Sequence, residues 1–428
     1  MEQVTVVGAG LAGCEATWQL VKRNIPVRLI EMRPKKESPA FHTDRFAELV
    51  CSNSLRSNAM NNAVGILKEE LRQLDSLIMK SADMHAVPAG SALAVDRETF
   101  SQYITDTIKN HPLVEVVTEE FTSLPEGPCI IATGPLTSDS LAKAIHDFTA
   151  EDTFHFYDAA APIIEKDSIN FNIAFYGDRY GKEGDSSYIN LPMNKEEYEI
   201  FYNELVNAEI VTLHEFEKKE IFEGCMPIEV MAKRGEDTIR FGPLKPVGFT
   251  DPRTNSRPYA IVQLRQDNTS GTLYNMVGFQ TNLKFGEQKR VFSLIPGLEN
   301  AEFVKYGVMH RNTFINSPEL LDNTYNLKAK SNIYFAGQIT GVEGYVESIA
   351  SGLVAGLNAV AKFNNTEKIT FPNETVIGAL SSYISTENTK FQPMNANFGI
   401  LPPLEEKIKD KIQRYTKMAE RALKSLEI

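Results

Sequence analysis

The stretch Val4-Thr5-Val6-Val7-Gly8-Ala9-Gly10-Leu11-Ala12-Gly13 decides the fold class of this chain. An apolar run typical of a β-strand leads into the pattern G-x-G-x-x-G, and residues with helical spacing follow from Cys14 to Lys22. A second apolar run, Val27 to Ile30, ends at Glu31. This order of strand, glycine-rich turn, helix, strand and acidic residue is the fingerprint of a dinucleotide-binding βαβ unit.

Each part of the fingerprint has a physical role. Gly8 allows the tight turn, Gly10 lets the backbone approach a pyrophosphate, and Gly13 lets the helix pack closely on the strand. The helix N-terminus offers N–H donors and the positive end of a dipole to the phosphates. Glu31 follows Gly13 by 18 residues and is placed to accept hydrogen bonds from ribose hydroxyls. The predicted cofactor-binding residues here are Gly8, Ala9, Gly10, Leu11, Ala12, Gly13 and Glu31.

A second pair of elements favours FAD over NAD as the bound dinucleotide. Cys129 to Gly134 is an apolar strand that ends in A-T-G, and Ile333 to Gln338 is a strand that ends in A-G-Q. Strands of this kind lie beside the cofactor in flavoproteins with two dinucleotide-binding motifs, and the second one precedes a helix whose N-terminus faces the flavin. Here Gly341 to Tyr345 leads into a small-residue helix expected over 348–361. Gly337, Gln338 and Tyr345 therefore join the predicted FAD-binding residues.

Composition and cysteine spacing narrow the class of protein. With 428 residues, 42% of them hydrophobic and 23% charged, the chain resembles an ordinary soluble globular protein of about two domains. We expect no signal peptide and no membrane span, because no basic leader or apolar run of about 20 residues occurs. The cysteines are scattered without metal-ligand spacing, so we expect no metal and a cytoplasmic, thiol-containing protein.

Charge is distributed unevenly. The formal net charge is −12, which argues against a protein that coats nucleic acid without selectivity. Between Met231 and Arg311, however, there are 12 Lys and Arg against 7 Asp and Glu, a local charge of +5. This asymmetry is compatible with an anionic partner such as a phosphate backbone or a polyglutamyl tail, and equally with a solvated mixed surface.

The pattern predicts an α/β chain in which a Rossmann-like FAD domain of the two-dinucleotide-binding type carries a smaller inserted α+β domain. We place the FAD domain at 1–140 plus 300–428 and the inserted, substrate-facing domain at about 140–300, where aromatic residues and prolines increase. Helical spacing is expected over 66–79, 97–109 and 404–426, the last as a solvated amphipathic helix. Residues 41–65, rich in Asn and Ser, are expected to form a functional loop.

Two cysteines are candidates for chemistry. Cys225 lies between Gly224 and Pro227, a turn context that exposes a thiol; Glu223 and Glu229 are candidate proton relays, and Lys233 and Arg234 would favour a thiolate. Cys51 lies in the sequence Glu48 to Ser54 and has the same two readings, reactive thiol or buried packing residue. Cys14, in the fingerprint helix, and Cys129, at the start of an apolar strand, are expected to be packing residues.

With these residues in view, the chain resembles the folate- and FAD-dependent tRNA uracil-5-methyltransferase family over nearly its whole length. Many long segments match in the right order. Cys14 and Leu191 stand where the family is expected to carry other residues, and neither touches the proposed chemistry. The matching segments are Gly8–Gly13, Glu48–Arg56, Val87–Arg97, Ala132–Ser138, Tyr157–Pro162, Phe222–Glu229, Phe241–Val247, Val277–Thr281, Tyr306–Thr313, Ala336–Leu353 and Phe398–Pro403.

The resemblance implies methylation of C5 of the T-loop uridine (position 54 of tRNA) to 5-methyluridine. The carbon donor implied is 5,10-methylenetetrahydrofolate, reduced FAD is carrier and reductant, and NADPH or NADH supplies electrons. Because C5 of uracil is a weak nucleophile, a thiolate must add to C6, and we assign Cys225 to that step. Cys51 is the second catalytic thiol, which either removes the C5 proton or protects the flavin-bound carbon. The uridine must leave its stacked position to react.

Tyr345, His310 and Arg311 each have a functional and a structural interpretation. Tyr345 either stacks on the flavin or the pterin ring or is a packed tyrosine. His310 and Arg311 either contact folate carboxylates or phosphate or form a structural pair.

The motifs leave alternatives open. The same chemistry on a uridine of 23S rRNA uses the same flavin, folate and uracil sites. A related flavoprotein family modifies the tRNA wobble uridine with a partner protein, but it carries a long helical C-terminal extension. A non-catalytic FAD-dependent RNA chaperone or sensor would keep the cysteines for packing only, and slow, unselective alkylation of Cys225 would favour that reading.

Overall fold

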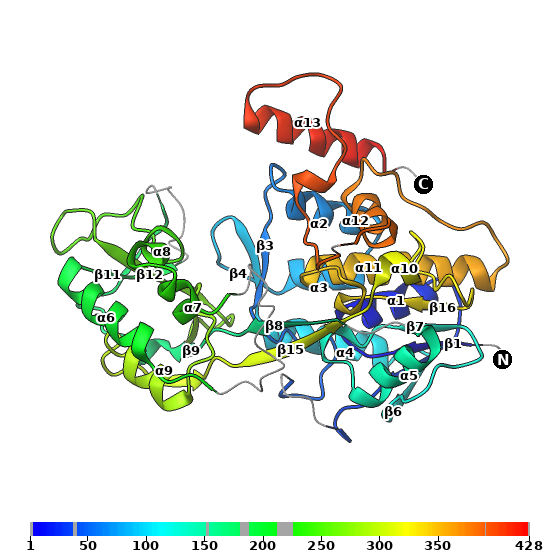
Figure 1. Cartoon of the computed structure of the whole chain (residues 1–428), viewed down its shortest axis with the longest axis horizontal. Helices are drawn as coiled ribbons and strands as arrows, with labels where there is room; N and C mark the ends of the chain where they lie inside the picture. Colours follow the sequence, from blue (N-terminus) through cyan, green and yellow to red (C-terminus); the bar gives the residue numbers. More distant parts are fainter. Residues whose placement is uncertain are drawn as a thin grey trace.

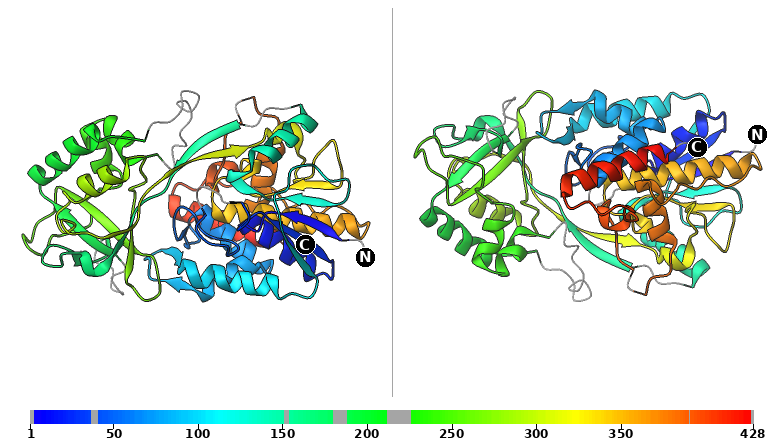
Figure 2. Two further views of the ribbon diagram at one scale, coloured as in Figure 1. Left: turned by 90° about the horizontal axis from the view of Figure 1, so that it is seen from below. Right: turned by 90° about the horizontal axis from the view of Figure 1, so that it is seen from above.

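The structure is a computed structural model that describes residues 3–36, 41–150, 154–179, 188–211, 226–389 and 391–426. The chain forms a large and a small lobe joined by a ribbon in which β8 (Phe154–Ala159) pairs antiparallel with β15 (Met309–Phe314) (Figure 1). In both views of Figure 2 the small lobe, in green, occupies one end of the long axis. Each lobe has its own hydrophobic core. The domain limits at about 140 and 300 stay a prediction.

A parallel sheet forms the centre of the large lobe, in the strand order β16-β7-β1-β2-β6. Its strands are short and rich in Val and Ile, and the central ones are buried on both faces, as parallel strands covered by helices are. Cys14 and Cys129 are fully buried, which confirms that they are packing residues. The strands are β1 (Val4–Val7), β2 (Val27–Glu31), β6 (Val114–Thr118), β7 (Cys129–Ile131) and β16 (Ile333–Phe335).

Two helices that are far apart in the sequence pack closely on each other. They are α1 (Leu11–Val21) and α11 (Tyr345–Phe363), which lie side by side beside the sheet (Figure 1). A Cβ atom on Gly352 of α11 would lie 2.3 Å from the carbonyl oxygen of Ala12. Glycine at this position therefore lets α11 touch α1.

The single helix expected over 66–79 is wrong, because the chain turns within it. The structure has α2 (Ala63–Gln73) and α3 (Leu77–Met84) instead. Asp75 takes a left-handed conformation (φ 56°), and the Ser76 side chain accepts a hydrogen bond from Met79 N to begin α3. The buried carboxylate of Glu15, in α1, stabilises the start of α3, because it accepts hydrogen bonds from Ser76 Oγ (2.6 Å) and Ile78 N (3.2 Å).

The rest of the large lobe surrounds this framework. The helix predicted over 97–109 is confirmed, and the C-terminal helix is shorter than the predicted 404–426. The elements are β3 (Ser54–Ser57), β4 (Ala86–Val87) and β5 (Ala92–Val95) in one small antiparallel sheet, and α4 (Arg97–Lys109), α5 (Asp139–Thr149), α10 (Ser317–Leu320), α12 (Val376–Ser385) and α13 (Lys411–Lys424).

The small lobe is an antiparallel sheet packed against helices, with the strand order β10-β11-β12-β13-β9-β14. Its strands are β9 (Ile163–Glu165), β10 (Phe175–Tyr176), β11 (Tyr188–Met193), β12 (Ala260–Gln266), β13 (Leu273–Met276) and β14 (Phe303–Lys305). Its helices are α6 (Lys195–Asn207), α7 (Ile228–Lys233), α8 (Glu236–Phe241) and α9 (Phe285–Phe292). In the part of the chain that the structure describes, no helix has the length and apolar character needed to cross a membrane.

Candidate active site

A cavity opens at the carboxyl ends of the parallel strands, where ligands of open α/β sheets bind. Its empty volume is about 1000 Å³, part of which is open to solvent. Eight of the ten residues predicted to bind FAD line this cavity: Gly8, Gly10, Leu11, Ala12, Glu31, Gly337, Gln338 and Tyr345. The structure therefore brings together two sequence elements that lie more than 300 residues apart.

The backbone geometry of the glycine-rich turn agrees with the role predicted for each of its glycines. Gly8 has φ +96°, and a Cβ there would lie 2.5 Å from the carbonyl oxygen of Ala132. A Cβ on Gly13 would lie 1.8 Å from the carbonyl oxygen of Gly8, so only glycine permits this contact of helix and strand. A Cβ on Gly10 would meet nothing within 4 Å, because Gly10 faces the cavity. Gly13 and Ala9 do not line the cavity but shape the turn.

Helix α1 begins at this turn without a side-chain cap. Its N-cap residue is Gly10, which offers no side-chain acceptor to the first N–H groups of the helix. Those groups carry the positive end of the helix dipole and suit an anionic group such as a phosphate. The cavity and the uncapped helix end therefore lie together, as the dinucleotide-binding pattern predicts.

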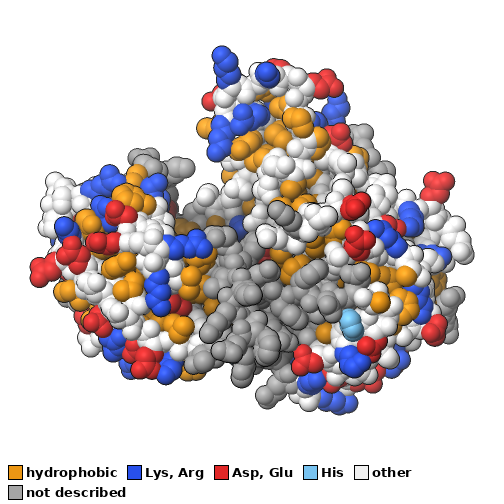
Figure 3. Space-filling view, viewed as in Figure 1, with side chains coloured by type: hydrophobic (Ala, Val, Ile, Leu, Met, Phe, Trp, Pro, Cys, Tyr) orange, Lys and Arg blue, Asp and Glu red, His pale blue; other side chains and the backbone are white. Residues whose placement is uncertain are grey.

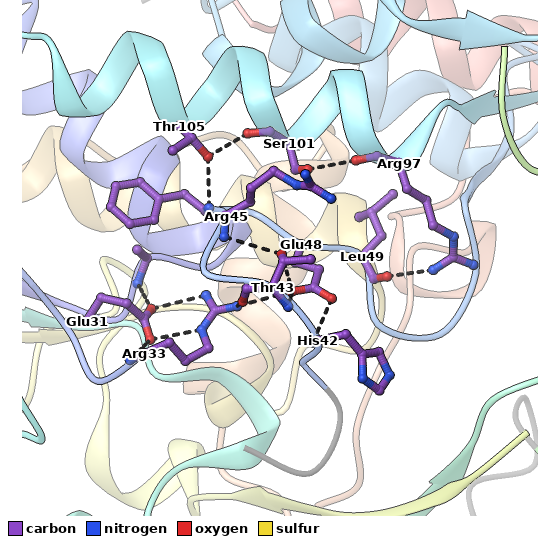
Figure 4. Close-up of polar contacts among 12 residues, drawn as sticks. Glu31, Arg33, His42, Thr43, Arg45, Glu48, Leu49, Arg97, Ser101 and Thr105 are labelled. Carbon is purple, nitrogen blue, oxygen red and sulfur yellow. Dashed lines mark hydrogen bonds and ion pairs between the residues drawn. The ribbon is translucent and has the colours of Figure 1, made fainter. Parts of the chain in front are cut away.

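Glu31 is held by four hydrogen bonds within the protein. It accepts from Ala9 N (2.9 Å), from Arg33 N (3.1 Å) and from the Arg33 guanidinium at Nε (3.0 Å) and Nη2 (3.3 Å) (Figure 4). Burial of this carboxyl acts to raise its pKa, but the hydrogen bonds and charge of Arg33 outweigh burial and hold the pKa of Glu31 below its ordinary value. These four bonds match the approximate number of lone-pair positions of the carboxylate, so a ribose hydroxyl would share or replace one of them.

Arg33 extends this network to the loop that follows β2. Its guanidinium bonds Thr43 O (3.2 Å) and Glu48 Oε2 (3.3 Å) and lies 4.1 Å from the ring centroid of Phe41. Glu48 in turn accepts from His42 N (3.0 Å), as Figure 4 shows. Both Phe41 and Glu48 line the cavity. The sequence did not single out Arg33, although its place two residues after Glu31 is what allows the pair to form.

The three other predicted FAD-binding residues, Gly337, Gln338 and Tyr345, lie on the opposite side of the cavity. Gly337 has φ +82° and donates its N–H to Ser351 Oγ (2.6 Å). Gln338 donates from Nε2 to Glu343 Oε2 (2.5 Å). Tyr345 is the first residue of α11, and its ring lines the cavity.

Cys51 lies next to this cavity and is bound to Tyr345. The Tyr345 hydroxyl accepts hydrogen bonds from Cys51 N (2.8 Å) and Ser52 N (3.1 Å). The Cys51 thiol contacts Ala159 O, at the end of β8, with Sγ 3.6 Å from the oxygen. The half-buried thiol therefore stands between the cavity in the large lobe and the ribbon that leads to the small lobe.

Three cationic side chains surround Cys51. Arg97 donates to Leu49 O (2.6 Å) and Cys51 O (3.3 Å) and forms an ion pair with Asp267. Arg265 of the small lobe donates to Ser52 Oγ (2.6 Å) and Asn53 Oδ1 (3.1 Å).

Lys305, at the end of β14, is the third of these cations. Burial lowers the pKa of Lys305, and the charge of Arg97 lowers it further. Each of the three cations interacts electrostatically with Cys51. Cys51 therefore differs from the fully buried Cys14 and Cys129 in having cationic side chains around it.

These cations are functional candidates that sequence reasoning did not single out. Arg97 ends the matching segment Val87–Arg97, which was a usable signal. Arg265 and Lys305 carry no such signal, because they reach Cys51 only through the packing of the two lobes.

A buried lysine fixes the strand that follows Cys51. Lys68 of α2 is fully buried, and its Nζ donates to Leu55 O (2.8 Å), Arg56 O (3.4 Å) and Ser57 O (2.6 Å). Arg56 has φ +61° and forms an ion pair with Glu347, which is buried in the first turn of α11. Lys68 and α11 therefore hold both ends of the segment that positions Cys51.

We expect the variant Lys68→Met to lose about 2–3 kcal/mol of unfolding free energy, because buried carbonyls of β3 would lack a donor. Its turnover should fall with the loss of order around Cys51. Denaturant unfolding and a steady-state assay measure the two effects. Lys80→Met, an exposed lysine of α3, is the matched control. Equal stability of the two variants would contradict the role given to Lys68.

The remaining residues that the sequence predicted to be functional do not line this cavity or lie outside the described residues. Cys225 and Glu223 lie outside the described residues, as do the side chains of His310 and Arg311. Glu229 is described and buried: it accepts from Thr281 Oγ1 (2.9 Å) and Asn282 N (2.8 Å), and burial raises its pKa. Its carboxyl is thus used to fix α7 to the segment before α9.

The parallel sheet, the glycine-rich turn and the cavity define a Rossmann-like protein of the dinucleotide-binding class. A family model described as "Glucose inhibited division protein A" matches residues 3–367. The chain is 64% identical to the methylenetetrahydrofolate–tRNA-(uracil-5-)-methyltransferase TrmFO of Listeria welshimeri, over all of this chain and 98% of that protein. It is 63% identical to the TrmFO of Acetivibrio thermocellus over the same shares. The chain therefore belongs to the glucose-inhibited division protein A family and, within it, to the TrmFO family.

A solved structure agrees with the fold. Aquifex aeolicus GidA matches with a TM-score of 0.70 at 17% identity, over 98% of this chain and 73% of that chain. At this identity the likeness concerns the fold alone. It confirms the predicted α/β class with a Rossmann-like domain.

Proposed function

We propose that this chain methylates C5 of a tRNA uridine, with 5,10-methylenetetrahydrofolate as carbon donor and FAD in the large-lobe cavity. The observation that carries the proposal is the position of Cys51, whose backbone is hydrogen-bonded to the cavity residue Tyr345 and whose thiol lies among three cations. The names of relatives at 60–64% identity describe tRNA uracil-5 methylation with methylenetetrahydrofolate.

The residues of the cavity fit FAD. Gly10 leaves room for a pyrophosphate beside the uncapped end of α1, and Glu31 with Arg33 borders the place of a ribose. Gly337, Gln338 and Tyr345 line the opposite side, where the flavin ring would lie. When bound, FAD supplies the carrier and redox chemistry that converts the one-carbon unit to a methyl group.

The protein's own part is covalent activation of uracil. We assign Cys225 as the thiolate that adds to C6, so that the electron pair moves to the C4 oxygen and C5 becomes nucleophilic. After C5 bonds to the one-carbon unit, the C5 proton is lost and the bond between that carbon and its carrier breaks. A hydride from the reduced cofactor would then complete the methyl group while the thiolate leaves C6 and the ring is restored. Cys51 is the second thiol, which removes that proton or protects the carbon unit. Arg265 and Lys305 interact electrostatically with Cys51.

The reaction is tested with purified holoprotein, unmodified tRNA, methylenetetrahydrofolate and either NADPH or NADH. Mass spectrometry of nucleosides should show 5-methyluridine, and comparison of the two nicotinamides identifies the reductant. Adduct formation with RNA that contains 5-fluorouridine tests the first thiol: a covalent adduct retained by Cys225→Ala would contradict its role.

The choice of RNA is tested in cells that lack the gene. We expect the T-loop methyl group of tRNA to disappear while ribosomal uridine methylation is unchanged, which would place the enzyme with cytoplasmic tRNA. Loss of a 23S rRNA methyl group instead would favour the rRNA alternative.

A further inference from the structure

The C-terminal helix carries a stripe of positive charge. Arg414, Lys417, Arg421 and Lys424 follow one another at spacings of three or four residues, so they lie on one side of α13. We name these four residues the basic stripe. Met418, Ala419 and Ala422 anchor the helix to the body near α2. In Figure 1, α13 stands above the rest of the large lobe.

The small lobe carries a second positive surface, the segment 233–257, which we name the small-lobe basic segment. It contains six Lys and Arg against three Asp and Glu. Lys245 and Arg257 are exposed. Phe241 is 58% exposed beside Arg240, whose guanidinium lies 3.8 Å from the ring centroid of Tyr259. Stacked arginine and exposed aromatic rings are typical of nucleic-acid contacts.

The two surfaces stand on either side of one notch. In Figure 1, α8 lies at the upper edge of the small lobe, on the side of the molecule from which α13 projects. Figure 3 shows Lys and Arg side chains on both sides of the notch between these parts. The chain as a whole has a net charge of −12, so a polyanion is repelled by most of its surface and attracted at these places.

We propose that the basic stripe and the small-lobe basic segment bind the phosphate backbone of tRNA, one on each side of the notch. This proposal rests on the proposed function and adds the surface by which the substrate is held. Since phosphate contacts position a nucleic acid without reading its sequence, these residues set affinity and orientation, while the groups around Cys51 act on the base. They are positioning residues for the RNA.

The test uses three FAD-loaded proteins with equal flavin content. The stripe variant carries Arg414→Gln, Lys417→Gln and Lys424→Gln; Arg421 is kept because it donates to the carbonyls of Pro402 and Pro403. The small-lobe variant carries Lys245→Gln and Arg257→Gln. A control with the same charge change as the stripe variant carries Lys143→Gln, Lys195→Gln and Lys362→Gln, which are exposed lysines of α5, α6 and α11.

Binding of an unmodified tRNA transcript is measured by fluorescence anisotropy over a range of NaCl concentrations. We expect Kd to rise about tenfold in the stripe variant, and the slope of log Kd against log salt to fall by about 2–3, since each phosphate contact contributes about 0.7–0.9. The small-lobe variant should lose less slope. KM for tRNA should rise with kcat unchanged.

Equal Kd and equal slope for the stripe variant and the control would overturn the proposal. So would a fall in kcat at saturating tRNA without a change in Kd, because that marks a structural effect on the active site. The proposed function is judged separately by the wild type: failure to form 5-methyluridine contradicts the reaction, whereas normal methylation with unaltered binding in the stripe variant contradicts only the binding surface.

Discussion

Gly13→Ala is expected to remove FAD from the protein and to lower the unfolding free energy by about 3 kcal/mol or more. A Cβ at this position would lie 1.8 Å from the carbonyl oxygen of Gly8, which is backbone and has no free rotamer to take. Helix α1 must then move away from β1, and with it the N–H groups that face the cavity. Flavin absorbance of the purified protein and its thermal unfolding measure the two losses.

Gly10→Ala is the matched control, because its Cβ would meet no protein atom within 4 Å. This variant should unfold like the wild-type protein without FAD. Its FAD affinity should still fall, since the added methyl group points into the cavity. If Gly13→Ala retained normal flavin content and normal stability, the packing role of Gly13 would be wrong.

Cys51→Ala is expected to reduce methyl transfer by about a thousandfold or more, with FAD content unchanged. The thiol is lost, but the backbone N–H groups that bond the Tyr345 hydroxyl are kept. Product is measured as 5-methyluridine by nucleoside mass spectrometry under single-turnover conditions, and flavin content by absorbance.

Cys51→Ser distinguishes chemistry from packing, because serine keeps the size and the hydrogen-bonding capacity of the side chain. We expect it to be as inactive as Cys51→Ala. Unaltered turnover in Cys51→Ala would exclude the catalytic role, and full activity of Cys51→Ser would show that a hydroxyl is sufficient.

The sequence was informative where function depends on local backbone geometry. The turn Gly8–Gly13 and the strand β16 before Gly337 were predictable, because a glycine pattern between a strand and a helix has few physical solutions. The same holds for the buried cysteines Cys14 and Cys129, whose neighbours are apolar.

The remaining features depend on contacts between distant segments. The predicted helix over 66–79 failed because a turn at Asp75 and a buried carboxylate some 60 residues earlier outweigh its apolar spacing. Arg265 meets Ser52 across 213 residues, and no periodicity reports such a pair. Lys68 would be read as a surface lysine of an amphipathic helix, yet it is buried among three carbonyl groups.

The ribbon between the lobes has a consequence for the surroundings of the Cys51 thiol. β8 connects the two bodies and ends at Ala159, the residue whose carbonyl Cys51 contacts. Arg265 and Lys305, two of the three cations that interact with Cys51, come from the small-lobe sheet. The large lobe thus carries Cys51 and Arg97, and the small lobe supplies the other two cations that interact with this thiol. The surroundings of Cys51 are therefore complete only when the two lobes pack together as they do in this structure.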